Sequence, residues 1–184
     1  MSLAGMRLAG MRRQAMRRWL GRAAAMLVLF ATTPAFSLDC HSRLFTWSDT
    51  EPAINRRHVF CGEIDHGRPK GVHSTQLLAT SAVVRRVEAA RGDCNGIYTA
   101  IVVFAHGQRK LSTFFPDQCT VEDVTQSIYH AGSHVAARHP AWGFIGPSAP
   151  ASNTPGFCLD ADRQPFEIRF GRLKDGRINT AFPN

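Results

Sequence analysis

The sequence of 184 residues predicts an α+β fold, built as a compact single domain with antiparallel sheets and a few helices. Three observations indicate this class. Short runs rich in β-branched and aromatic residues alternate with turn residues along the chain. Two pairs of these runs are joined by short turns, as in antiparallel hairpins. Only one segment shows clear helical spacing of its apolar residues.

The N-terminal segment 1–37 has the pattern of a signal peptide. Six arginines and no acidic residue precede an apolar run of nine residues, from Ala23 to Ala31. This run is too short to cross a bilayer, which takes roughly 20 apolar residues in a helix. Small residues at Ala35 and Ser37 fit the cleavage site of a signal peptidase, so we expect residues 38–184 to form the mature domain.

This leader predicts a secreted or periplasmic product, with no stable membrane insertion after signal cleavage. Two other export routes remain as alternatives. Arg17-Arg18 is similar to a twin-arginine signal, and Cys40 stands where a lipoprotein cysteine would, although Asp39 before it disfavours lipidation. The remaining chain of about 147 residues suffices for one hydrophobic core but not for two.

The first elements expected in the domain surround two histidines. Residues 59–64 are a short apolar run, which predicts a strand opened by His58, and residues 65–71 predict a turn. Residues 77–90 fit either a helix or a strand around residue 83, and the sequence does not decide between them.

A central hairpin and a helix follow. Residues 97–104 predict a buried strand, and residues 110–115 predict its hairpin partner. Thr120 and Asp123 have the spacing of a capping box, and the apolar residues after them recur at helical spacing. We therefore expect a helix over residues 121–131, ended by the glycine at 132.

The tail is predicted as a long loop and a closing hairpin. Four prolines in residues 138–157 favour a surface loop without regular structure. Residues 166–170 and 177–182 predict two strands, and Lys174-Asp175-Gly176 between them favours a tight turn.

Charge and cysteines constrain function only loosely. Without the six leader arginines, the 22 basic residues fall to 16 against 14 acidic ones, so binding of a nucleic acid would need a local basic patch. The candidate clusters are Arg56-Arg57, Arg68 with Lys70, Arg109-Lys110, and Arg172 to Arg177. The five cysteines predict two disulfides and one free thiol in an oxidising compartment, with the pairing left open, and their spacing does not fit a zinc knuckle.

His58 and His73 are the candidate acid–base pair, because the glycine turn before His73 can fold it back beside His58. Imidazole titrates near pH 6.5, so one ring can accept a proton while the other donates one. Cleavage of RNA needs both steps, since the 2′-hydroxyl loses a proton as it attacks phosphorus and the departing 5′-oxygen gains one. An ammonium such as Lys110 would stabilise the extra negative charge on the phosphorane.

Two alternatives compete with this interpretation of the histidines. The chain has eight histidines, so pairs arise without any function. A metal site built from His58, His66 and His73 is also conceivable, but no Asp or Glu is clearly placed to complete it.

Read as a string, these residues resemble the EndoU endoribonuclease family. The family pattern is a histidine, a Gly-Glu-Ile and a second histidine after a glycine turn, and it is matched by His58-Val59-Phe60-Cys61-Gly62-Glu63-Ile64 and Gly71-Val72-His73. Residues 110–117 are similar to the lysine-bearing strand of the family, especially of its bacterial branch, and residues 178–183 to its closing strand. The resemblance covers about residues 55–183.

The resemblance implies an α+β fold shared with RNase toxins and cleavage of single-stranded RNA on the 3′ side of uridines, leaving 2′,3′-cyclic phosphate ends. It assigns His58, His73 and Lys110 as catalytic residues, and we expect His73 to be the base and His58 the acid. No cofactor is required, although Mn²⁺ stimulates several relatives. Single-stranded RNA is the expected partner, and a cognate immunity protein would join it if the enzyme is a toxin rather than a scavenger of environmental RNA.

The resemblance also suggests substrate-binding residues. Thr180 matches a hydroxyl residue used near the base and phosphate. Phe182 stands where many relatives have a tyrosine, so it can stack on a pyrimidine but cannot donate a hydrogen bond, and a place in the core is an equal interpretation. Ser112 and Thr113 are candidates for the cleft, although alternation along a strand predicts that only one of them faces it.

The remaining residues of the motif have simpler interpretations. We expect Gly62 and Gly71 at positions of positive φ or close backbone approach. Glu63 fits either a partner that orients a histidine or a solvent-exposed charge, and the second is favoured. Two other functions remain open: a non-catalytic RNA- or protein-binding module on the same fold, for which Phe182 would mark lost chemistry, and a secreted disulfide-stabilised protein whose basic loops contact the envelope.

Overall fold

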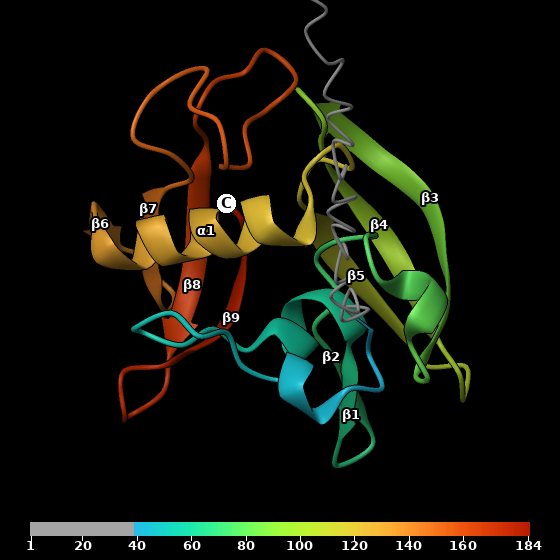
Figure 1. Ribbon diagram of the computed structural model, residues 1–184. Helices are drawn as coiled ribbons and strands as arrows, with labels where there is room; N and C mark the ends of the chain where they lie inside the picture. Colours follow the sequence, from blue (N-terminus) through green and yellow to red (C-terminus); the bar gives the residue numbers. More distant parts are fainter. Residues whose placement is uncertain (1–38) are drawn as a thin grey trace, which may run out of the picture. The chain divides into compact units, whose positions relative to one another are not determined.

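Three antiparallel sheets and one α-helix make up the part of the chain that the computed structural model describes, residues 39–184 without the side chains of 89–91 and 93 (Figure 1). This architecture confirms the predicted α+β class. The predicted leader, residues 1–37, lies outside the described residues.

Each sheet is formed by strands that are consecutive in the chain. The two-stranded sheet is β1 (Glu63–Asp65) and β2 (Arg68–Lys70). The three-stranded sheet is β3 (Val84–Cys94), β4 (Ile97–Phe104) and β5 (Arg109–Phe114). The four-stranded sheet is β6 (Ala137–Arg138), β7 (Phe144–Pro147), β8 (Glu167–Arg172) and β9 (Ile178–Pro183).

Both predicted hairpins are confirmed. β4 pairs with β5 and β8 pairs with β9, each antiparallel. The turn between β8 and β9 uses Gly176 at φ +90°, a conformation that glycine adopts without steric cost.

The predicted helix is observed as α1 (Val121–Ser133), with the capping box at its start. The Thr120 hydroxyl accepts from the Asp123 amide at 3.1 Å, and the Asp123 carboxylate accepts from the Thr120 amide at 3.0 Å. The expected end at Gly132 was one residue too early. A Cβ at Gly132 would lie 2.7 Å from Ile178 Cδ1, so this glycine lets the helix approach β9 instead of ending the helix.

The predicted strand opened by His58 is wrong. Residues Arg57–Cys61 form a π-helical turn, η2, and strand structure begins only at Glu63. Val59, Phe60 and Cys61 are all buried, which a helical turn against a core permits and a surface strand with alternating faces does not. A short apolar run has no periodicity that separates these two cases.

The prediction that residues 138–157 form a loop without regular structure is also wrong in part, because this segment contains β7. Gly146 lies within β7, where a Cβ would come 2.3 Å from the carbonyl oxygen of Ala131 in α1. The glycine is therefore a packing residue, and Pro147 ends the strand. For residues 77–90, the structure has a short 3-10 turn, η3 (Leu78–Thr80), and then the start of β3.

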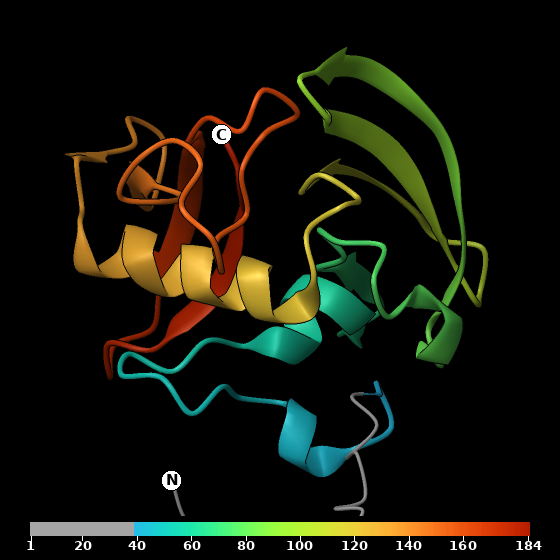
Figure 2. The same cartoon turned by 45° about the horizontal axis from the view of Figure 1, so that its top comes forward.

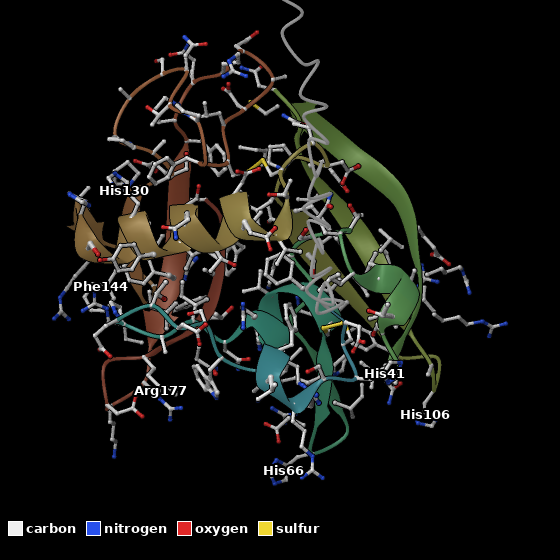
Figure 3. The ribbon with its side chains drawn as sticks, in the orientation of Figure 1. His41, His66, His106, His130, Phe144 and Arg177 are labelled. Carbon is white, nitrogen blue, oxygen red and sulfur yellow. A yellow bond between two sulfur atoms is a disulfide. The ribbon has the colours of Figure 1, made fainter. Side chains whose placement is uncertain are left out.

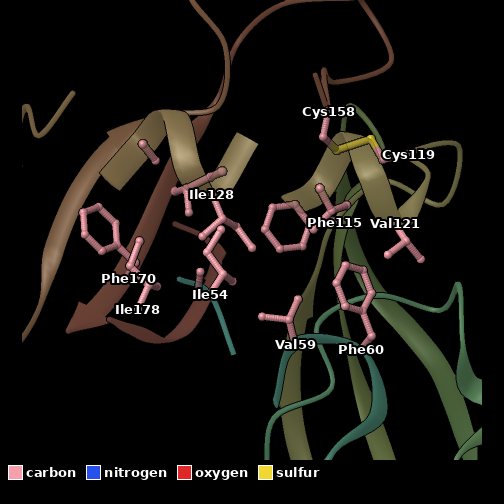
Figure 4. Packing of buried hydrophobic residues seen from close by; sticks show 14 of the residues in the cluster. Ile54, Val59, Phe60, Phe115, Cys119, Val121, Ile128, Cys158, Phe170 and Ile178 are labelled. Atoms are coloured by element: carbon pink, nitrogen blue, oxygen red, sulfur yellow. A yellow bond between two sulfur atoms is a disulfide. The ribbon is translucent and has the colours of Figure 1, made fainter. Parts of the chain in front are cut away.

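The four-stranded sheet and α1 enclose the larger of two hydrophobic clusters (Figures 1 and 2). Ile54 and Ile178 lie beside Ile128 of α1, while Phe60 of η2 and Phe115 pack nearby (Figure 4). A smaller cluster lies against the three-stranded sheet and consists of Val72, Ala100, Val102, Phe104 and Phe114. The turn η2 and the segment after β2 thus belong to one cluster each, and they meet between the two larger sheets.

Two disulfides and one free thiol occur in the described residues, as expected. Cys40 pairs with Cys61 and Cys119 with Cys158, while Cys94 is free and exposed. No helix within residues 39–184 is long and apolar enough to span a membrane.

Candidate active site

The segment after β2 pairs with the π-helical turn η2 and brings two histidines together. The Val72 amide donates to the His58 carbonyl at 2.9 Å, and the His73 amide donates to the Val59 carbonyl at 2.7 Å. Gly71 has φ +73°, and a Cβ on it would lie only 2.0 Å from the His58 carbonyl oxygen. Glycine is therefore required here, and Gly62 likewise has φ +73°, so the expectation for both glycines is confirmed.

One residue at this junction has a strained backbone conformation. Val72, a β-branched residue, has φ +67°, a conformation that costs on the order of 1–3 kcal/mol and persists only where the surroundings enforce it. Val72 is fully buried, and its amide hydrogen bond to His58 fixes the backbone. The strain sits immediately before His73 and so helps to set the direction of that side chain.

His58 is buried and has its ring oriented by a carboxylate. Its Nδ1 lies 2.7 Å from Glu63 Oε1, and its amide donates to Asn55 Oδ1 at 3.0 Å. The hydrogen bond from His58 holds the pKa of Glu63 below its usual value, so Glu63 is an ionised acceptor. Nδ1 therefore carries a proton, and Nε2 is left to exchange one. The favoured interpretation of Glu63 as a solvent-exposed charge is wrong, because β1 turns it back toward the ring.

His73 is also buried, and a main-chain carbonyl orients its ring. Nδ1 lies 2.9 Å from the Thr113 carbonyl oxygen, which can only accept, so Nδ1 bears the hydrogen. Burial and the nearby positive charge of Lys110 hold the pKa of His73 well below its ordinary value of 6.5. At neutral pH the ring is therefore uncharged, with a free lone pair on Nε2.

Lys110 of β5 brings an ammonium beside the histidines. Its Nζ donates to the Gly71 carbonyl at 3.1 Å and to Ser112 Oγ at 2.5 Å. Within residues 39–184 it takes part in no ion pair with a carboxylate. Burial lowers its pKa to about 8, so most of it remains cationic at neutral pH.

These side chains line one pocket of about 300 Å³. The His58 and His73 ring centroids are 6.0 Å apart, and the rings are inclined by 23°. The lining residues are His58, Lys70, Gly71, His73, Lys110, Leu111, Ser112, Thr113, Trp142, Thr180 and Phe182. The structure thus brings together in one place every candidate site residue of the sequence.

The candidate substrate-binding residues lie on two strands. Thr180 and Phe182 are two positions apart in β9 and share a face, and the Phe182 ring stacks on His73 at 5.0 Å. Phe182 therefore lines the pocket and is not a core residue. Ser112 and Thr113 both belong to the pocket lining. The Ser112 hydroxyl contacts Lys110, whereas Thr113 acts through its main-chain carbonyl, which holds the His73 ring, so these contacts agree with the alternation of side chains along the strand.

The hypothetical metal site is not formed. His66 lies at the tip of the β1–β2 hairpin and points outward with 94 % of its side chain exposed (Figure 3), whereas His58 and His73 are buried. No group of three or more His, Cys, Asp or Glu side chains in residues 39–184 could hold a metal ion.

The basic clusters predicted from sequence reach the pocket only through two lysines. Lys70 lies in the lining and forms an ion pair with Asp65, and Lys110 is the second. The neighbouring arginines have local partners: Arg109 forms an ion pair with Glu88, and Arg177 with Asp175. Of the predicted basic clusters, Lys70 and Lys110 are therefore the members that line the pocket.

Sequence reasoning did not find Trp142 or Lys70 as lining residues. Trp142 lies in the segment read as an irregular loop, and its only signal was an aromatic residue followed by Gly143 in a proline-rich stretch. Lys70 was noted as a basic residue alone. Both reach the pocket through contacts between distant segments, which local patterns do not contain.

The arrangement can perform acid–base chemistry on a phosphodiester. It provides one neutral imidazole, a second imidazole paired with a carboxylate, and an ammonium, all lining the same pocket. The family model described as "Bacterial EndoU nuclease" matches residues 53–184, which is more than half of the chain and contains every residue of the pocket. No curated protein and no solved structure matches the chain. The family match and the pocket agree: the chain belongs to the bacterial EndoU nuclease family.

Proposed function

We propose that this nuclease is an exported endoribonuclease that cleaves single-stranded RNA on the 3′ side of uridines and leaves 2′,3′-cyclic phosphate ends. The convergence of His58, His73 and Lys110 on one pocket carries this proposal. Export is supported by the leader pattern of residues 1–37 and by two disulfides in the domain.

His73 acts as the base. Its Nδ1 hydrogen is held by the Thr113 carbonyl, and its lowered pKa keeps Nε2 unprotonated at neutral pH. Nε2 takes the proton of the 2′-hydroxyl as the 2′-oxygen forms its bond to phosphorus.

His58 acts as the acid. The Glu63 carboxylate fixes its tautomer and faces the positive ring that forms when Nε2 also carries a proton. Nε2 gives this proton to the 5′-oxygen as the bond between phosphorus and that oxygen breaks, so no charged alkoxide leaves.

Lys110 stabilises the negative charge that develops on the non-bridging oxygens. Its hydrogen bonds to the Gly71 carbonyl and to Ser112 hold the ammonium in place, and burial strengthens its field because few waters screen it. The uridine base stacks on Phe182, and the Thr180 hydroxyl on the same face reads the edge of the base.

The experiment uses an oligodeoxynucleotide with a single ribouridine and reads the mass of the products. We expect one cleavage, on the 3′ side of the ribouridine, with a cyclic phosphate on the upstream product and a 5′-hydroxyl on the downstream one. Replacement of the ribouridine by deoxyuridine should abolish cleavage, because the 2′-oxygen is the nucleophile. A linear phosphate formed directly, or cleavage of the all-deoxy strand, would contradict the proposal. A matched incubation with a chelator tests whether Mn²⁺ contributes.

A further inference from the structure

The four-stranded sheet has one face covered by α1 and one face that continues from the pocket. α1 packs on β7 and β8 from one side (Figures 1 and 2). On the other side, Arg169 of β8 is paired with Phe182 of β9, and Gly171 is paired with Thr180. Because Thr180 and Phe182 line the pocket, this face extends the pocket surface across β8.

The indole of Trp142 lies on this face. A Cβ at Gly171 would come 3.3 Å from Trp142 Cζ3 and 3.3 Å from Thr180 Cγ2, so the missing side chain gives the indole its place. The Trp142 and Phe182 ring centroids are 5.8 Å apart, with the rings inclined by 64°. Trp142 nevertheless remains 44 % exposed, although it is one of the largest apolar side chains of the domain.

Arg169 holds this indole in position. Its Nε donates to the Trp142 carbonyl at 3.2 Å, and its Cζ lies 3.9 Å from the indole centroid, so the guanidinium covers one face of the ring. Its Nη2 is buried and has no hydrogen-bond partner among the residues described. Two contacts therefore hold the guanidinium on Trp142: the stack on the indole and the hydrogen bond from Nε to the Trp142 carbonyl.

Four aromatic rings are neighbours in the order His58, His73, Phe182 and Trp142. The centroid distances are 6.0 Å from His58 to His73, 5.0 Å from His73 to Phe182 and 5.8 Å from Phe182 to Trp142. In the proposed mechanism the nucleotide that leaves lies at His58, and the uridine stacks on Phe182, whose ring also lies against His73. Trp142 adjoins Phe182, the ring that stacks the uridine in the proposed mechanism, so a base stacked on Trp142 would belong to the nucleotide on the 5′ side of the uridine, away from the leaving group.

We propose that Trp142, held by Arg169, is a second base-binding platform that stacks the nucleobase on the 5′ side of the cleaved uridine. This subsite rests on the proposed function for its direction along the RNA. Stacking on an aromatic ring accepts any base, so the platform adds affinity for longer RNA without adding sequence preference.

Binding of uncleavable ligands tests the platform separately from catalysis. The two-nucleotide ligand is deoxyuridine followed by adenosine, and two three-nucleotide ligands carry one more adenosine on the 5′ or on the 3′ side. We expect the 5′-extended ligand to bind on the order of 10-fold more tightly than the two-nucleotide ligand, and this gain to disappear in Trp142→Ala and return in Trp142→Phe. Trp47→Ala is the matched control, because Arg177 lies 4.1 Å over the Trp47 ring but Trp47 is not in the pocket lining.

Fluorescence gives a second readout that a purely structural role would not change. The chain has three tryptophans, so Trp19→Phe combined with Trp47→Phe leaves only Trp142. The 5′-extended ligand should quench its emission more than the two-nucleotide ligand does. Equal affinities for the three ligands, no binding of any ligand, or a gain that Trp142→Ala retains would overturn the platform. A gain on the 3′-extended ligand alone would overturn its direction. Retained 5′ gain without cleavage of a ribouridine substrate would instead refute the proposed function and leave the platform standing.

Discussion

At the scale of single residues, the site depends on two imidazoles in different surroundings. His58 faces a carboxylate through Nδ1, whereas His73 faces a main-chain carbonyl and lies near the ammonium of Lys110. The Glu63 carboxylate fixes the tautomer of the His58 ring, while burial beside a cation keeps the His73 ring neutral. The same side chain can therefore serve as acid in one position and as base in the other.

The charge of Lys110 should be visible in the titration of His73. Burial is the main cause of the low pKa of His73, and the positive charge of Lys110 is the next. Lys110→Met removes that charge, so the pKa of His73 should rise toward its ordinary value and the imidazole should protonate at a higher pH. NMR titration of the His73 ring in both proteins measures this change. Lys70→Met is the control, because Lys70 also lines the pocket but pairs with Asp65; an identical His73 midpoint in the wild type and Lys110→Met would contradict the account.

At the scale of the elements, the turn after β2 decides whether the histidines meet. Gly71 and Gly67 both have positive φ, +73° and +74°, but a Cβ at Gly71 would strike the His58 carbonyl while a Cβ at Gly67 would meet nothing within 4 Å. We expect Gly67→Ala to cost about 1–2 kcal/mol of stability and to leave activity intact. Gly71→Ala must move the two histidines apart, and a displacement of about 1 Å lowers the rate on the order of 10²-fold.

Cleavage rates and thermal unfolding of the two variants make this comparison. Equal activity of Gly71→Ala and Gly67→Ala would show that the turn does not position the site. The pair is informative because both glycines lie in one short segment and share the same backbone conformation.

The elements that the sequence predicted are those whose signals are local. The hairpins β4–β5 and β8–β9 follow from β-branched runs and turn residues, and the start of α1 follows from Thr120 and Asp123. The π-helical turn η2 and the strand β7 depend on contacts with distant segments: Val59 and Phe60 are buried together by the larger core, and Gly146 is required by Ala131 of α1. Such tertiary contacts override short-range patterns.

The candidate site, like the fold, was predicted from sequence only where its signals are local. His58, His73 and Lys110 were found because the family motif is written in contiguous strings. Trp142 and the orienting role of Glu63 emerge only when β7, β8 and the β1–β2 hairpin are in place. A tryptophan in a proline-rich stretch has no sequence partner that reveals its ring contacts.

At the scale of the whole domain, the disulfide Cys40–Cys61 ties the N-terminal segment to the turn that contains His58. It closes a loop of 21 residues, for which loss of the bridge costs about 3 kcal/mol of unfolding free energy. Cys40→Ala with Cys61→Ala should therefore lower the denaturation midpoint, while Cys94→Ser, at the free and exposed thiol, should leave it unchanged. Chemical denaturation under oxidising conditions measures both, and equal midpoints for the double variant and the wild type would contradict the prediction.

The most direct test of the account compares a 5′-oxygen with a 5′-sulfur leaving group after a single ribouridine. A thiolate leaves without a proton. His58→Ala should therefore lower the cleavage rate of the oxygen substrate on the order of 10²-fold or more, and it should leave the cleavage rate of the sulfur substrate nearly at the wild-type value. His73→Ala should lower the cleavage rate of both substrates, because the 2′-hydroxyl still needs a base. Wild-type rates on the oxygen substrate in both variants would show that these two imidazoles do not perform the reaction.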